Sequence, residues 1–294
     1  MRFFAFYIAY SFLWLITLLP LSVLYVFSDL FYFFIYRLLR YRRKVVSENL
    51  RFAFPEKPAD ERSKIEKAFY HHFCDFLFES IKTLHLSKAQ FNKRFVFLNP
   101  ETLNDYHQKK QSVVLVSGHY GNWEWMASAE KYIRHKYLAI YKPLANKQYD
   151  RLIKNIRKKH TSVGELVSMN DVYKEILRHI RSNQLIVTWF LGDQSPPKDY
   201  PLWINFMNRE TPFYSGPEKI ARKFGHAVVF MNINKVKRGY YEVEFTPLFD
   251  EPKKTSENEI TLAHVKMLED TIRKKPEYWL WSHRRWKHEK PGAD

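Results

Sequence analysis

The segment Val113-Val-Leu-Val-Ser-Gly-His-Tyr-Gly-Asn-Trp-Glu124 carries the clearest structural signal in this chain of 294 residues. Its first four residues are apolar, which is typical of a strand buried on both faces of a parallel sheet. Two of only eight glycines follow, Gly118 and Gly121, and they predict a tight turn. Asn122 is a favoured N-cap and Glu124 suits the positive end of a helix dipole, so a helix is expected to begin near Asn122. In open α/β sheets, such strand ends are where ligands bind.

Strand and helix patterns alternate outward from this segment. Five β-branched runs predict strands, at residues 112–117, 137–141, 185–189, 227–233 and 240–245. Helical patterns lie between several of them, at residues 123–134, 147–159, 171–181 and 217–224, and residues 45–95 also have helical spacing. This alternation predicts an α/β fold with a mostly parallel sheet flanked by helices.

The composition narrows the class of protein. Hydrophobic residues make up 46% of the chain, which excludes intrinsic disorder as its main state. The single cysteine, Cys74, excludes an intrachain disulfide framework and a cysteine-rich zinc site, and it fits a reducing compartment. The net charge of +17 predicts an anionic partner. Nucleic acid is the default partner for such charge, but no recognised nucleic-acid motif accompanies it, and we expect no nucleic-acid binding.

The N-terminal part of the chain predicts a membrane anchor. Residues 3–36 carry a single charge, Asp29, and a transmembrane helix needs about 20 apolar residues. We expect residues 3–26 to be embedded, with a kink at Pro20, and residues 28–44 to form an interfacial stretch, since a charge is costly in mid-membrane. The aromatic residues of that stretch include Phe31, Phe33, Phe34 and Tyr36. The alternatives are a buried core helix and a cleaved signal peptide, but no A-x-A-like cleavage site is present.

The charges that flank the apolar run predict its orientation. Only Arg2 precedes the run, whereas five cations follow it: Arg37, Arg40, Arg42, Arg43 and Lys44. The positive-inside rule then places the rest of the chain in the cytoplasm. We therefore expect an anchor of residues 1–36 in the cell inner membrane and a cytoplasmic α/β domain of residues 37–294. Cations beside the membrane are attracted to anionic headgroups, so we also expect membrane phospholipid as a partner.

His119 and Glu124 are the best candidates for chemistry. A spacing of five residues turns the side chains apart by roughly 140° in a regular helix, so they meet only if His119 lies in the turn and Glu124 on the helix. A carboxylate on one imidazole nitrogen fixes the tautomer and leaves the other nitrogen as a general base. Two other pairs share this spacing: His160 with Glu165, and His264 with Glu269. Neither follows a strand and a glycine turn, and the alternative for His119 is a histidine packed at a sheet edge.

The ends of two other predicted strands supply further candidates. Lys142 follows the strand at residues 137–141 and could stabilise an oxyanion or hold a phosphate; the alternative is a solvated surface lysine. Asp193 follows the strand at residues 185–189 and could orient Lys142 or position an acceptor. For Asp193 the alternative is a turn-forming residue beside Gly192, and Gln194 has the same two interpretations.

The segment 273–290 near the C-terminus mixes seven basic residues with four aromatic ones, which are Tyr278, Trp279, Trp281 and Trp286. This mixture predicts an interfacial surface, with aromatic rings at headgroup depth and cations on phosphates. Single-stranded nucleic acid would suit the same pattern, but the anchor favours lipid. Four residues with metal-binding side chains are clustered elsewhere: His71, His72, Cys74 and Asp75. They lie on a predicted helix whose apolar stripe needs no metal, so we expect no metal site.

Six ordered blocks, which cover nearly the full length, resemble the late (lauroyl/myristoyl) acyltransferases of lipid A biosynthesis, in the lysophospholipid acyltransferase-like superfamily. The segment Ser117-Gly-His-Tyr-Gly-Asn-Trp-Glu124 resembles the His-x4-acid motif of that family. The other blocks are Tyr141-Lys-Pro-Leu-Ala-Asn146, Leu191-Gly-Asp-Gln194, Asn205-Phe-Met with Thr211-Pro and Gly216, Arg42-Arg-Lys-Val with Asn49-Leu and Phe54-Pro55, and Pro276-Glu-Tyr-Trp-Leu-Trp-Ser-His-Arg-Arg-Trp-Lys287.

The resemblance implies a glycerolipid acyltransferase-like fold and a membrane-bound acyltransferase with an HX4E motif. It implies that His119 and Glu124 are a catalytic dyad that activates an acceptor hydroxyl. The acyl donor would be an acyl-(acyl carrier protein) thioester and the acceptor a lipid A precursor, with no metal or other cofactor. Helix N–H groups and Lys142 would stabilise the oxyanion. We expect substrate binding by six residues: Gly121, Asn122, Lys142, Asn146, Asp193 and Gln194.

Two departures from the family pattern concern the substrates. Lys142 replaces the arginine of the second block, so a two-pronged contact to phosphate or carboxylate becomes a point charge. Residues 195–197, Ser-Pro-Pro, replace a tyrosine–glycine turn. The alternative acceptors are therefore a lysophospholipid, an aminolipid or a glycolipid. A non-enzymatic membrane scaffold that recruits an acidic partner is a further alternative, and in it His119 would have no role.

Overall fold

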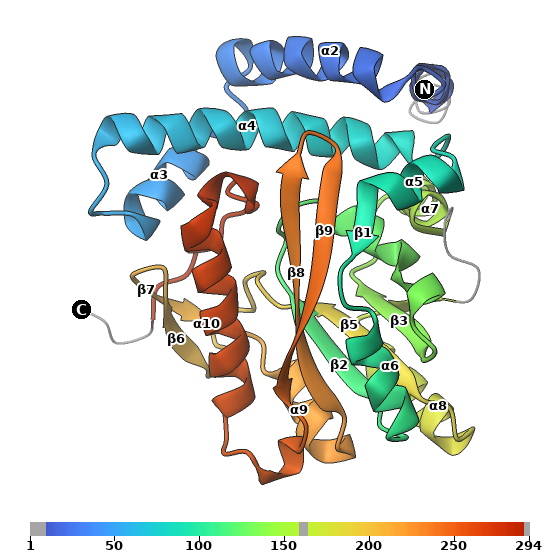
Figure 1. The fold of residues 1–294 in the computed structure, drawn as a ribbon. Coiled ribbons are helices and arrows are strands. Elements are labelled where there is room, and N and C mark those ends of the chain that lie inside the picture. The colour runs from blue at the N-terminus through green and yellow to red at the C-terminus, as the bar shows by residue number, and fades with distance from the viewer. Residues whose placement is uncertain (1–9, 159–163, 291–294) are drawn as a thin grey trace.

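A seven-stranded sheet forms the centre of the computed structural model, which describes residues 10–158 and 164–290 (Figure 1). Its strands follow the order β1-β9-β8-β2-β5-β3-β4, and every neighbouring pair is parallel except β8 and β9. Their bounds are β1 (Phe95–Phe97), β2 (Val113–Ser117), β3 (Lys136–Tyr141), β4 (Glu165–Ser168), β5 (Ile186–Leu191), β8 (Ala227–Lys237) and β9 (Tyr240–Phe249). The prediction of an α/β fold with a mostly parallel sheet is confirmed.

Helices cover the sheet, and a small hairpin of β6 (Trp203–Phe206) and β7 (Arg209–Pro212) lies beside it. The helices around the site are α4 (Ala59–Lys82), η2 (Trp123–Tyr132), α7 (Lys147–Lys158), α9 (Gly216–Phe224), α10 (Glu259–Lys274) and η4 (Pro276–Tyr278). The others are α2 (Leu21–Tyr32), η1 (Phe33–Leu38), α3 (Arg43–Ala53), α5 (Lys88–Arg94), α6 (Glu101–Gln108), α8 (Val172–Arg181) and η3 (Pro252–Lys254). The helix predicted at residues 123–134 is a 3-10 helix, η2, and η1 is a π-helix.

Strand β2 is buried on both faces, as its unbroken apolar run predicts. Val113 and Leu115 have no exposed surface and pack into the core on one face of the sheet. Val114 and Val116 are equally buried in the core on the other face. Strands β5 and β8 are parallel to β2, and β3 is parallel to β5. The residues that follow β2, β5 and β3 therefore all lie at the carboxyl-terminal ends of the strands. These strand ends face α4 (Figure 1).

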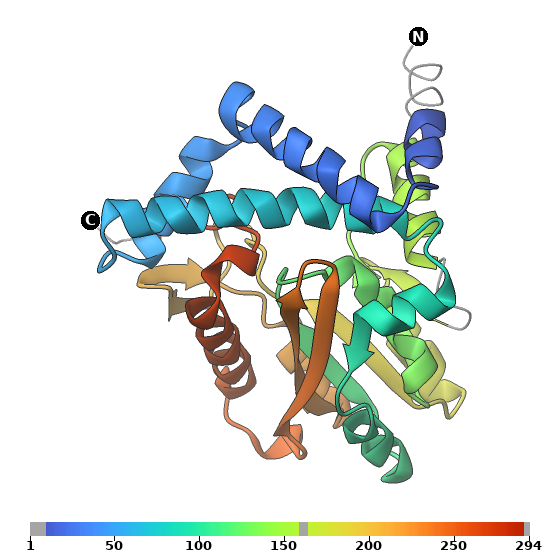
Figure 2. The ribbon, with the colours of Figure 1, turned by 45° about the horizontal axis from the view of Figure 1, so that its top comes forward.

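One helix in the described part of the chain is long and apolar enough to cross a membrane, Leu21–Leu38, with a mean hydropathy of 1.4 over 18 residues. It comprises α2 and η1, and α2 packs along α4 (Figures 1 and 2). Pro20, where a kink was predicted, interrupts the helical path entirely, because residues 17–20 are not helical. The helix also continues past residue 26, through part of the stretch predicted as interfacial. Residues 1–9 of the predicted anchor lie outside the described residues.

Candidate active site

The imidazole of His119 is held by Asp193. His119 lies in the turn after β2, and its Nδ1 is 2.6 Å from Oδ1 of Asp193, which follows β5. The backbone N–H of His119 also donates to Oδ2 of Asp193, at 2.8 Å. Since an ionised carboxylate only accepts hydrogen bonds, Nδ1 carries a proton in this contact, and in the neutral imidazole the free lone pair is then on Nε2. This is the state in which an imidazole acts as a general base.

Asp193 is buried, with 3% of its surface exposed. Trp279 donates its indole Nε1–H to Oδ2 of Asp193 at 2.8 Å. Burial by itself would raise the pKa of Asp193, but the charge of His119 and the hydrogen bonds from His119 and Trp279 outweigh burial and lower it below its usual range. The group facing His119 is therefore a carboxylate at any physiological pH.

The second imidazole nitrogen faces a more open region. The side-chain nitrogen of Gln194 lies 3.2 Å from Nε2 of His119, and Gln194 is exposed. The ring of Trp123 meets the imidazole edge to face, with 5.2 Å between ring centroids. An exposed amide on Nε2 can give way to a substrate hydroxyl, whereas the buried carboxylate on Nδ1 cannot.

The prediction that Glu124 holds an imidazole nitrogen is wrong in this structure. Glu124 does lie on a helix and His119 in a turn, but both Glu124 oxygens accept hydrogen bonds from Arg157 of α7, each at 2.7 Å. The planar guanidinium fork matches the carboxylate and forms one hydrogen bond to each of its oxygens. Burial would lower the pKa of Arg157, but the hydrogen bonds and charge of Glu124 raise it above its usual value. Arg157 was missed in the sequence because it lies 33 residues from Glu124.

The turn between β2 and η2 is fixed by its glycines and by Asn122. Gly121 has a φ of +61°, and a Cβ there would lie 2.9 Å from Ile233. A Cβ on Gly118 would lie 2.6 Å from Leu268. Asn122 is fully buried and donates to Oε2 of Glu79 at 2.8 Å, rather than capping η2 with its side chain. The contacts of Gly121 and Asn122 thus build the turn that presents His119.

Two predicted substrate-binding residues lie apart from this turn. Lys142 follows β3 and is exposed, and within the described residues it has no hydrogen-bond or ion-pair partner. The side-chain oxygen of Asn146 accepts hydrogen bonds from the N–H groups of Gln148 and Tyr149. Asn146 therefore caps the start of α7, a role that explains an asparagine there without a substrate.

The segment predicted as an aromatic interfacial surface is instead packed against the site. Trp279 and Trp281 are 2% and 0% exposed, so the prediction that they lie at headgroup depth is wrong. The N–H of Leu280 donates to the carbonyl oxygen of His119, and Tyr120 forms a β-bridge with Trp279. Arg285 is also buried, and burial lowers its pKa to about 9. The apolar rings are needed to enclose Asp193, which is why they are not available to lipid.

Comparison with known proteins identifies the family of this chain. A family model described as bacterial lipid A biosynthesis acyltransferase matches residues 1–288. This chain belongs to that family. The lipid A biosynthesis lauroyltransferase of Escherichia coli K12 is 23% identical over 96% of this chain and 90% of its own length. The palmitoleoyltransferase of the same strain is 22% identical, over 85% of this chain and 80% of its own length. A lipid A biosynthesis acyltransferase of Haemophilus influenzae is also 22% identical, over 86% of this chain and 78% of its own.

The family membership confirms the resemblance seen in the sequence and makes the protein an acyltransferase of lipid A biosynthesis type. A buried carboxylate of this acyltransferase, Glu79 on α4, was missed in the sequence. It accepts hydrogen bonds from Asn122, from the Tyr241 hydroxyl at 2.7 Å and from the Tyr25 hydroxyl at 3.0 Å. Burial raises the pKa of Glu79. The signal was a glutamate among the buried positions of a predicted helix.

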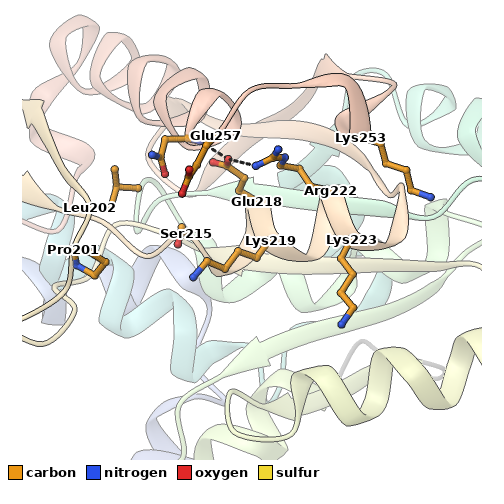
Figure 3. A pocket seen from close by; sticks show the side chains of 10 residues that line it. Pro201, Leu202, Ser215, Glu218, Lys219, Arg222, Lys223, Lys253 and Glu257 are labelled. Atoms are coloured by element: carbon orange, nitrogen blue, oxygen red, sulfur yellow. Dashed lines mark hydrogen bonds and ion pairs between the residues drawn. The ribbon is translucent and has the colours of Figure 1, made fainter.

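A cavity of about 520 Å³ lies elsewhere on the acyltransferase, beside α9 (Figure 3). Its lining includes four cations: Lys219, Arg222, Lys223 and Lys253. Glu218 also lines it, but its carboxylate accepts from the N–H groups of Asn258 and Thr261 at the start of α10. None of the predicted site residues lines this cavity.

Among residues 10–158 and 164–290, one cluster has the side chains of a metal site. Atoms of Glu165, Glu175 and His179 lie within 4.8 Å of one another. Arg178 donates to both glutamates, at 2.6 and 2.7 Å, and Lys136 lies 3.4 Å from Glu165. Two cations already neutralise these carboxylates, so the cluster is an ion-pair network. The sequence also contains four clustered candidates for metal ligands, His71, His72, Cys74 and Asp75. Of these four, Asp75 forms an ion pair with Arg238.

Proposed function

We propose that this acyltransferase transfers a fatty acyl chain from acyl-(acyl carrier protein) to a hydroxyl of a lipid A precursor. The observation that carries the proposal is the imidazole of His119, held on Nδ1 by buried Asp193 and open on Nε2, at the end of the central strand. The names of the relatives, a lauroyltransferase and a palmitoleoyltransferase, support a long acyl chain. Acyl carrier proteins are acidic, and a net charge of +17 suits such a donor.

The reaction follows from this arrangement. An acceptor hydroxyl replaces the Gln194 amide at Nε2 of His119, and His119 removes its proton as the oxygen attacks the thioester carbonyl. Asp193 stabilises the imidazolium that forms. When the tetrahedral intermediate collapses, the carbon–sulfur bond breaks and the imidazolium returns the proton to the departing sulfur. General acid–base catalysis of this kind contributes about 10²–10⁴-fold in rate.

Other residues support the transition state in this proposal. The first N–H groups of η2 have no carbonyl partner within their own helix, so they suit a developing oxyanion together with Lys142. Glu124 keeps its place in the active site as a positioning residue, because its pair with Arg157 fixes η2 against α7. His119 is thus the catalytic base and Asp193 its carboxylate partner.

The proposed place of action is the cytoplasmic face of the inner membrane. One apolar helix near the N-terminus is consistent with a membrane anchor. The cations that follow it favour the cytoplasmic leaflet, whose anionic lipids attract basic segments beside the membrane. At this surface the lipid acceptor and a soluble acyl donor can both reach one site.

Mass spectrometry of lipid A from a deletion strain tests the proposal. The strain should produce lipid A that lacks one acyl chain, because the proposed reaction adds that chain. A plasmid with the wild-type gene should restore the chain, and one with His119→Ala should not. Fully acylated lipid A in the deletion strain, with a different lipid lost, would instead support the alternative acceptors. Lys142 and the Ser-Pro-Pro sequence at residues 195–197 favour that second candidate, because both depart from the family pattern.

A further inference from the structure

The helix formed by α2 and η1 has one apolar face that no part of the described protein covers. Seven large apolar residues on it are between 38% and 63% exposed: Val23, Val26, Phe27, Leu30, Phe33, Phe34 and Leu38. They recur every three or four residues, the spacing that places side chains on one face of a helix. A continuous apolar face of this size indicates contact with another apolar phase.

The opposite face is bound to the protein by polar contacts. Leu24 is fully buried, and Ser28, which is 1% exposed, donates to Oδ1 of Asp75 on α4 at 2.8 Å. The Tyr25 hydroxyl donates to Oε1 of Glu79, also on α4, at 3.0 Å. These hydrogen bonds would have no partners in hydrocarbon, so this face has to remain on α4.

A charge near the middle of the helix joins it to the body of the protein. Asp29 accepts hydrogen bonds from Arg238, in the turn between β8 and β9, at 2.6 and 3.1 Å. The same guanidinium binds Asp75 at 2.6 and 3.0 Å. A helix that crossed the bilayer would bring Asp29 to mid-membrane, where a charge is costly. Either Arg238 would have to enter the membrane with Asp29, or the ion pair between them would be lost.

The length and the flanking charges of the helix agree with a surface position. Leu21–Leu38 has 18 residues, slightly fewer than the roughly 20 that a membrane-spanning helix needs. Exposed cations lie in its last turn and just after its end: Arg37, Arg40, Arg42 and Lys44. Cations beside an apolar face are typical of helices that lie in the plane of an anionic membrane.

From these contacts we infer that α2 and η1 lie flat in the interface of an anionic bilayer, with the exposed face among the acyl chains, and do not cross the membrane. This inference rests on the membrane attachment in the proposed function. It places α4 next to the membrane, because α2 packs against α4 and crosses it obliquely (Figure 2). The strand ends that carry His119 and Asp193 face α4 and therefore face the membrane (Figure 1).

Depth measurements on the full-length protein test the inference. In a Cys74→Ala background, single variants Val23→Cys, Leu30→Cys and Leu38→Cys are labelled with bimane and bound to vesicles of phosphatidylethanolamine and phosphatidylglycerol. Lipids with doxyl quenchers at different chain positions then report depth. A flat helix gives the same shallow depth at all three positions. A label at Leu262, an exposed position near the start of α10, is the control and should not be quenched.

The outcomes separate the inference from the proposal beneath it. A deep signal for Leu30 with shallow signals at Val23 and Leu38 would show a spanning helix and overturn the inference, while the membrane attachment would stand. No quenching at any of the three positions would overturn both. The role of the anionic lipid is measured separately. The double variant Arg37→Gln with Arg40→Gln should bind these vesicles several-fold more weakly than the wild-type protein does. Equally tight binding of the wild-type protein to neutral phosphatidylcholine vesicles would contradict a role for the anionic lipid.

Discussion

At the scale of single residues, the site depends on which carboxylate meets His119. Asp193 contacts both Nδ1 and the backbone N–H of His119, and Trp279 closes the other side of the carboxylate. Glu124, although five residues from His119 in sequence, is bound to Arg157. The chemical roles of the two acids are therefore distinct, and their variants should behave differently.

Replacement of Asp193 by asparagine should lower kcat by about 10²-fold or more, because the amide cannot stabilise an imidazolium or fix the Nδ1–H tautomer. Turnover of acyl-(acyl carrier protein) by membranes that contain the variant measures this. Gln194→Ala is the matched control, since Gln194 is exposed and lies on the nitrogen that the substrate needs. Comparable losses in the two variants would argue against Asp193 as the partner of the base.

At the scale of elements, η2 and α7 are joined by one bidentate pair, Glu124 with Arg157. The pair holds η2, and with it the turn that carries His119, in a fixed orientation. Glu79 supports the same turn from α4 through Asn122. The base is thus positioned by two helices that lie far from it in sequence.

A double-mutant cycle on Glu124 and Arg157 tests this role. We expect Glu124→Ala and Arg157→Ala to reduce kcat by similar factors, and the double variant to be no worse than either, because all three lose the same contact. If Glu124 acted directly on His119, Glu124→Ala would be far more severe than Arg157→Ala. The pH dependence of kcat/KM should keep its shape in both single variants, since the pair between His119 and Asp193 remains.

The sequence was sufficient for the elements with strong local patterns. The apolar run at residues 113–116 predicted β2, and four other strands and the helices α7, α8 and α9 were placed close to their observed bounds, whereas α6 and α10 were not predicted. Strands β1, β4, β6 and β7 were missed because they have only three or four residues, too few for a pattern. The partner of His119 was misassigned for a different reason: Asp193 is 74 residues away, and only the pairing of β2 with β5 brings it close.

At the scale of the whole molecule, buried histidines link stability to pH. Burial lowers the pKa of four of them to about 4: His135, His226, His264 and His283. In the unfolded chain their pKa is about 6.5, so between about pH 6.5 and 4 the unfolded chain binds protons that the folded protein does not. The free energy of unfolding should therefore fall as the pH falls through this window, by about 1.4 kcal/mol per histidine for each unit of pKa difference.

Thermal unfolding measured between pH 7.5 and 4.5 checks this expectation. The melting temperature should decrease steadily below about pH 6.5. His226→Gln cannot titrate and should make the decrease shallower, whereas His107→Gln, at a half-buried position, is the control. Identical slopes for wild type and His226→Gln would contradict the link between burial and acid sensitivity.

The way in which the final segment closes the site has a consequence for biosynthesis. Leu280, Tyr278 and Trp279 supply backbone and indole hydrogen bonds to the turn of His119 and to Asp193. When every strand of the sheet has been translated, these three residues have not yet been synthesised. A nascent or prematurely terminated chain that stops at residue 275 would have all seven strands of the sheet and no assembled catalytic centre, so the enzyme becomes competent only after residues 276–280 have been synthesised.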